Sequence, residues 1–131
     1  MFGSRRGSEM VESALAGMVF LLLLAGIMEG GRLGFTYNSV SFAAHRAARF
    51  AAVRGSASGH AASAADIAAE AEALVAALDA TKLTVTTTWT PDNHPGSTVQ
   101  VKVSYQFQTV LVPFSSGPMT LATTSKQVIT Q

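Results

Sequence analysis

The stretch that decides the fold lies at residues 13–28 and reads Ser13-Ala-Leu-Ala-Gly-Met-Val-Phe-Leu-Leu-Leu-Leu-Ala-Gly-Ile-Met28. It holds no charged residue, and as a helix it would cover about 24 Å. The hydrocarbon core of a membrane is about 30 Å thick, and the gap closes if Met10 and Val11 count and Glu12 is neutral or paired. We therefore predict a transmembrane helix over about residues 11–28. A cleaved secretory signal is the alternative. It is disfavoured because the apolar run is long, follows the acidic Glu12 and has no A-x-A site behind it.

A short basic segment, residues 1–7, precedes this helix and carries Arg5 and Arg6. Basic residues on one flank of a span favour the cytoplasmic side for that flank. The asymmetry is not clean, because Arg32 and Arg46 follow the span within about twenty residues. We nevertheless expect the N-terminus inside and the rest of the chain outside the cytoplasm.

The helix is predicted to continue far beyond the membrane. No proline occurs between Glu29 and Arg54, and six alanines in this stretch favour helix. A helix over residues 8–54 would be about 70 Å long, with Gly30-Gly31 as the expected position of a kink. Glu29 and Arg32 stand three positions apart and can pair on one face.

Beyond Gly55 the sequence predicts a helix followed by strands. Ser63 and Asp66 have the spacing of a capping box, and apolar residues then recur at helical intervals. From residue 83 apolar and polar residues alternate, which predicts strands over 83–90, 99–107 and, less regularly, 121–130. We expect the second helix to cover the apolar face of the sheet, formed by Val85, Trp89, Val101, Val103 and Tyr105.

The predicted fold class is therefore α+β, with a long N-terminal transmembrane helix, a second amphipathic helix and a small antiparallel sheet of about three strands. The expected organisation is a leader at 1–7, the long helix at 8–54 and an extracytoplasmic domain at 55–131.

Composition excludes several function classes. Only 13% of the 131 residues are charged, the net charge is +1, and there is no cysteine. No basic field is present for nucleic acid, and disulfides or thiolate zinc sites are impossible. The three histidines, His45, His60 and His94, have no metal-site spacing, and no catalytic or nucleotide-binding motif occurs. We expect no enzyme activity, no cofactor, no metal and no small-molecule substrate.

The arrangement around Gly7 is the most informative feature for function. A basic leader ends in Gly7, and Glu12 falls at the fifth position when Ser8 is counted as the first. This resembles the precursors of type IV pilin-like proteins, which a prepilin peptidase cuts after the glycine. A carboxylate in a lipid-facing segment needs a partner, and the freed amine of Ser8 in a neighbouring subunit could supply one. Alternatively, Glu12 is only an acid near a helix N-terminus at headgroup level.

Four further segments resemble the TadE-like family, the minor pilins or pseudopilins of the tight-adherence type IV pilus. They are Val11-Glu-Ser-Ala-Leu15, Gly26-Ile-Met-Glu-Gly-Gly-Arg-Leu33, Tyr37-Asn38 and Ala43-Ala-His-Arg-Ala-Ala-Arg49. Ser13 departs from the family pattern, where an aromatic residue follows the acid. The resemblance covers about residues 7–54. It implies a bacterial pilus protein, connected with cell adhesion, whose partners are pilin subunits, pilus assembly proteins and the processing peptidase.

Gly26, Gly30 and Gly34 form a stripe of glycines at four-residue spacing through the outer end of the anchor. Such stripes let membrane helices approach closely, although glycine is also simply tolerated there. Two other functions stay open: a membrane-tethered binding module that uses the sheet or the loop 110–114, and a pseudopilin of a related secretion or competence machine. The expected location is the bacterial cytoplasmic membrane, with possible incorporation into an extracellular pilus.

Overall fold

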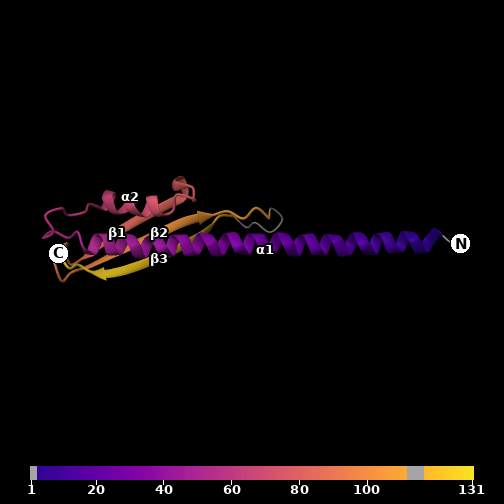
Figure 1. Cartoon of the computed structure of the whole chain (residues 1–131), viewed down its shortest axis with the longest axis horizontal. Helices are drawn as coiled ribbons and strands as arrows, with labels where there is room; N and C mark the ends of the chain where they lie inside the picture. Colours follow the sequence, from indigo (N-terminus) through magenta and orange to yellow (C-terminus); the bar gives the residue numbers. More distant parts are fainter. Residues whose placement is uncertain (1–2, 112–116) are drawn as a thin grey trace.

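A computed structural model describes residues 3–111 and 117–131 and confirms the α+β fold class. The elements are the helices α1 (Gly3–Ala52) and α2 (Ala64–Leu74), a 3₁₀ turn η1 (Ala80–Lys82), and the strands β1 (Leu83–Thr90), β2 (Thr98–Phe107) and β3 (Met119–Val128). The strands form one antiparallel sheet in the order β1-β2-β3. Figure 1 shows α1 projecting far beyond this sheet towards the N-terminus.

Helix α1 is 50 residues long and runs without interruption through Gly30 and Gly31. It begins before Ser8, since nothing in the basic segment stops a helix, and it ends at Ala52. The last turn tightens there, with the Arg54 amide donating to the carbonyl of Ala51 at 3.2 Å. Figure 1 shows no sharp bend in the helix, so the expected kink is absent from it.

The second half of α1 packs on the sheet through an alanine stripe. The stripe consists of side chains that are 0–1% exposed: Val40, Ala43, Ala44, Ala47, Ala48 and Ala51. Alanine lets the helix backbone lie close to the apolar face of β2, which buries every second residue from Val99 to Phe107. This packing is the largest part of the core.

The expectation that the second helix covers the sheet was therefore wrong in its main part. The C-terminal half of α1 covers β2 and β3, whereas α2 lies beside α1 and, among the strands, packs mainly on β1 (Figure 1). The reason is size: α2 has 11 residues and buries Ile67 and Ala71. Its start is as predicted, because Ser63 and Asp66 form a capping box.

The C-terminus closes the end of α1 opposite the projecting half. The Thr130 amide donates to the carbonyl of Ala52 at 2.9 Å, and Ile129 is 1% exposed. A Cβ on Gly55 would collide with the carbonyl oxygen of Gln131 and the side chain of Ile129. Only glycine therefore fits at the position where the chain leaves α1.

Candidate functional site: the projecting helix and its junction with the sheet

The projecting half of α1 exposes a large apolar surface. Its exposed large side chains are Met10, Val11, Leu15, Met18, Val19, Phe20, Leu21, Leu22, Leu23, Leu24, Ile27 and Met28. Among the described residues, this is the one helix long and apolar enough to cross a membrane, and none of its apolar window is buried. Water would solvate such a surface poorly, so it needs lipid or other helices as its surroundings.

The predicted cleavage residues lie in the first turns of α1. Gly7 and Ser8 are helical and exposed, and Glu12 is exposed one turn further on. Within residues 3–111 and 117–131, Glu12 forms no ion pair. The fold of one chain thus leaves this carboxylate free for a partner from outside.

The glycine stripe is also unoccupied within the chain. A Cβ at Gly26, Gly30 or Gly34 would meet nothing within 4 Å. No contact inside the described part of the chain therefore requires glycine at these positions, and their outer surface is open to another helix.

Glu29 and Arg32 join the projecting half of α1 to the sheet. The predicted ion pair is present, with Arg32 Nη1 3.0 Å from Glu29 Oε2. The second guanidinium nitrogen, Nη2, donates to the carbonyl of Gln108 at 2.8 Å, and the backbone amide of Val110 donates to Glu29 Oε1 at 3.0 Å. The Arg32 guanidinium also lies 4.7 Å from the ring centre of Phe107. We call this group of five residues the junction clamp.

The junction clamp holds the chain that follows β2 against α1 (Figure 1). Beside it, Ala25 and Met28 face Val110 and Leu111 across an apolar hollow of about 300 Å³. The hollow is at the outer end of the predicted span, so the clamp lies where the helix would leave the membrane. The sequence predicted the Glu29–Arg32 pair but not its partners in the chain after β2. The helical spacing that predicts the pair says nothing about which groups its second nitrogen and second oxygen bind.

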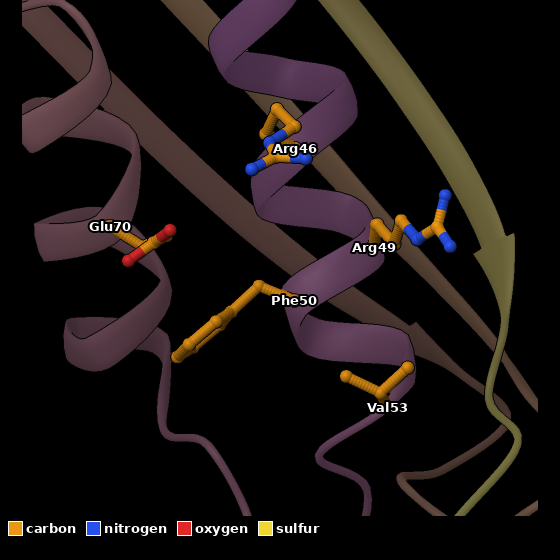
Figure 2. Close-up of a pocket in the computed structure, with 5 residues that line it drawn as sticks. All are labelled: Arg46, Arg49, Phe50, Val53 and Glu70. Atoms are coloured by element: carbon orange, nitrogen blue, oxygen red, sulfur yellow. The ribbon is translucent and has the colours of Figure 1, made fainter.

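A second feature lies near the other end of α1, on the face turned away from the sheet. Arg46, Arg49, Phe50 and Val53 line a hollow of about 200 Å³, with Glu70 of α2 on its far side (Figure 2). Arg54 lies 4.3 Å from the ring centre of Phe50. In the described part of the chain the one salt bridge is that of the junction clamp, so these arginines have no acidic partner there.

Two of the three histidines have side-chain partners. Nδ1 of His45 lies 3.0 Å from the hydroxyl of Ser125 on β3, and Nδ1 of His94 lies 2.8 Å from the hydroxyl of Ser56. Over the described residues no group of three potential metal ligands occurs. Of the apolar loop 110–114, residues 112–114 lie outside the described residues, and Val110 is exposed.

Three exposed aspartates stabilise turns and the start of α2. Hydrogen bonds from the backbone and side chain of Ser63 lower the pKa of Asp66. The hydroxyl and amide of Thr81 lower the pKa of Asp79, and the hydroxyl of Ser97 with the amide of His94 lowers that of Asp92. Each bond favours the ionised carboxylate, so these groups are structural and anionic at neutral pH.

Residues 7–49 match the family model described as TadE-like protein. The N-terminal helix is TadE-like. The match confirms the resemblance drawn from the sequence and supports a protein of the tight-adherence pilus system. Together with the exposed apolar helix, it fits a single-pass membrane protein. No curated protein and no solved structure matches the chain.

Proposed function

We propose that this protein is a minor pilin, or pseudopilin, that helps to initiate, prime or stabilise a tight-adherence pilus. The observation that carries the proposal is the division of α1: its second half is packed on the sheet, and its first half is apolar and not buried by the rest of the chain. That first half lies within the TadE-like match. An assembly mechanism based on helix contacts needs such a projecting apolar helix.

The first step is removal of residues 1–7 by a prepilin peptidase, with cleavage between Gly7 and Ser8. Both residues are in the first turns of α1, where helices open most easily, and glycine lowers helix stability by about 1 kcal/mol relative to alanine. Local opening would present an extended backbone to the peptidase. Cleavage then creates the Ser8 amine, which pairs with Glu12 of a neighbouring subunit, an acid with no ion pair among the described residues.

Helix contacts between subunits follow from the open glycine stripe. Without side chains at Gly26, Gly30 and Gly34, the backbones of neighbouring helices can approach closely in the membrane or in a filament. The sheet domain lies outside the cytoplasmic membrane, and the partners are other pilin subunits and pilus assembly proteins. No chemical reaction is assigned to the protein.

N-terminal sequencing of the membrane-bound protein tests the proposal. In cells with the prepilin peptidase the mature chain should begin at Ser8, and in cells without it at Met1. Gly7→Ala should be partly processed, whereas a bulky residue at this position should block processing. A mature chain that begins at Met1 in both strains, or at a position beyond Met28, refutes the proposal.

A further inference from the structure

The hollow on the outer face of α1 has a complement elsewhere on the same helix. Its four α1 residues, Arg46, Arg49, Phe50 and Val53, are spaced as one face of a helix. The residues 37 positions earlier are Glu9, Glu12, Ser13 and Ala16. The same spacing therefore places two acids where the hollow has two bases, and two small residues where it has two large apolar ones.

From this correspondence we infer that the hollow binds the N-terminal end of α1 from a second copy of this chain. The inference rests on the proposed function, since it requires that the leader be removed and that the chain leave the membrane. Copies that insert with the same orientation have parallel helices. Parallel helices pack residues of equal height side by side, so a stagger of 37 residues pairs Glu9 with Arg46 and Glu12 with Arg49.

The charged side chains involved are accessible, and Arg46 also lies 5.9 Å from the ring centre of Phe42. Glu9, Glu12, Arg46 and Arg49 are all exposed, and within the described residues none of them forms an ion pair. In Figure 2, Phe50 extends from α1 towards α2, Arg49 extends towards the side of β3, and Arg46 projects from the helix one turn before Phe50. Glu70 is the one acid that lines the hollow, against Arg46 and Arg49, while the neighbouring Arg54 is offset by Asp66. The local charge is therefore positive and attracts acids.

Shape agrees with charge. Ser13 would lie opposite Phe50, and Ala16 opposite Val53, which is 46% exposed. A small residue opposite a large one lets two helices interdigitate without a void. Glu12 keeps its proposed pairing with the Ser8 amine of another neighbour, because a carboxylate accepts several hydrogen bonds and can meet Arg49 as well.

The stagger has a consequence for location. At a rise of 1.5 Å per residue, 37 residues correspond to about 56 Å. Two copies resting in the membrane at the same depth cannot be displaced by that distance. The contact can form only when one copy has moved outwards, so it belongs to a filament and not to the membrane pool. The structure thereby assigns this chain a place inside the assembled fibre.

Cysteine cross-linking tests the register directly, because the natural chain contains no cysteine. One copy carries Ser13→Cys and a co-expressed copy carries Phe50→Cys, and sheared filaments are oxidised. A disulfide-linked dimer should form in filaments and be at least tenfold weaker in membranes of a strain without the assembly ATPase. Ala16→Cys with Val53→Cys should behave alike. Ser13→Cys with Phe42→Cys, eight residues out of register on the same face, should give no dimer.

An equal dimer in both fractions, a stronger dimer with Phe42→Cys, or cross-links only to a different pilin would each overturn the inference. So would a chain that is processed at Gly7 but never leaves the membrane, an outcome that leaves the cleavage step of the proposed function intact. An unprocessed chain would overturn both.

A charge exchange distinguishes loss of the proposed Glu9–Arg46 pairing from loss of folding. Arg46→Glu should lower the amount of this protein in filaments at least fivefold, and Glu9→Arg in the same chain should restore it. Glu9 is used because Glu12 already has a role in the proposed function. Loss without recovery in the double variant, with α1 and the sheet folded by circular dichroism, contradicts the pairing.

Discussion

Replacing Arg32 with alanine should release the chain that follows β2 from helix α1. The variant loses the 2.8 Å hydrogen bond to the carbonyl of Gln108, the 3.0 Å ion pair with Glu29 and the contact with the Phe107 ring. Hydrogen bonds to charged groups contribute about 1.5–3 kcal/mol, and the Arg32 side chain is 46% exposed, so the low end applies. An exposed cation–π contact adds about 0.5 kcal/mol and the helical ion pair about 0.3 kcal/mol. The expected loss is about 2 kcal/mol, or about a 30-fold change in the local opening equilibrium.

Amide hydrogen exchange of the full chain in detergent micelles or nanodiscs measures this opening. Exchange over residues 108–111 should become about 30-fold faster in Arg32→Ala, while protection in β1 and β2 should be unchanged. Glu29→Gln is the matched control, because the carboxamide oxygen can still accept from the Val110 amide and the bond from Arg32 to Gln108 is kept, while the ion pair and its hydrogen bond to Arg32 are lost. Its effect should be less than threefold.

Unchanged exchange over residues 108–111 in Arg32→Ala would refute the reasoning, since the junction clamp would then contribute nothing to holding the loop. An effect as large in Glu29→Gln as in Arg32→Ala would also count against it. In that case the ion pair, and not the bond to Gln108, would dominate.

Other substitutions test the fold, the aspartates and the assembly step. Gly55→Ala should lower the free energy of unfolding by about 1–3 kcal/mol, because its Cβ overpacks the site. Gly31→Ala, in open space on α1, should raise it by up to about 1 kcal/mol. Thermal unfolding of the two variants should therefore give changes in stability of opposite sign. The pKa of Asp92 is lower when the chain is folded, so its stabilising effect is complete at neutral pH and is lost as the pH falls below about 4. The melting temperature of Asp92→Asn should therefore depend less on pH between pH 5 and 3 than that of the unchanged chain. Glu12→Ala should leave processing intact but reduce pilus number, because loss of a buried ion pair costs about 3–5 kcal/mol. Loss of a helix-dipole interaction alone costs about 0.3–1 kcal/mol and would leave pilus number nearly unchanged. Normal pilus number at matched protein level would therefore support only the helix-dipole role of Glu12. Gly30→Leu should weaken cross-linking to partner pilins without affecting membrane insertion, and unchanged cross-linking would exclude a packing role for the glycine stripe.

Local features of the fold could be predicted from the sequence because their causes are local. The capping box of Ser63 and Asp66, the alternation along β2 and the length of the apolar helix each depend on neighbouring residues. Which helix covers the sheet could not be predicted. The alanines from Ala43 to Ala51 read as strong helix formers, and the same small size lets α1 lie on β2.

The candidate site was likewise predictable only in its local contacts. Glu29 and Arg32 pair at a spacing that any helix provides, but their partners lie after β2, and the bond from Arg32 to Gln108 joins positions 76 residues apart. A single sequence does not reveal such a contact. The complement between residues 9–16 and 46–53 could have been found from the sequence, yet it has meaning only because the structure shows that Arg46, Arg49 and Val53 are exposed and Phe50 is half-buried.

The junction clamp and the alanine stripe together determine how a force on the sheet domain reaches the apolar half of α1. The stripe fixes the second half of α1 to β2, and the clamp fixes the chain after β2 to α1 at the point where the helix leaves the predicted span. Between them no loop intervenes, because α1 is continuous from Gly3 to Ala52. A pull on the sheet domain along the helix axis therefore acts directly on the apolar half. A chain built in this way can be drawn outwards as one unit, which is the displacement that the 37-residue stagger requires.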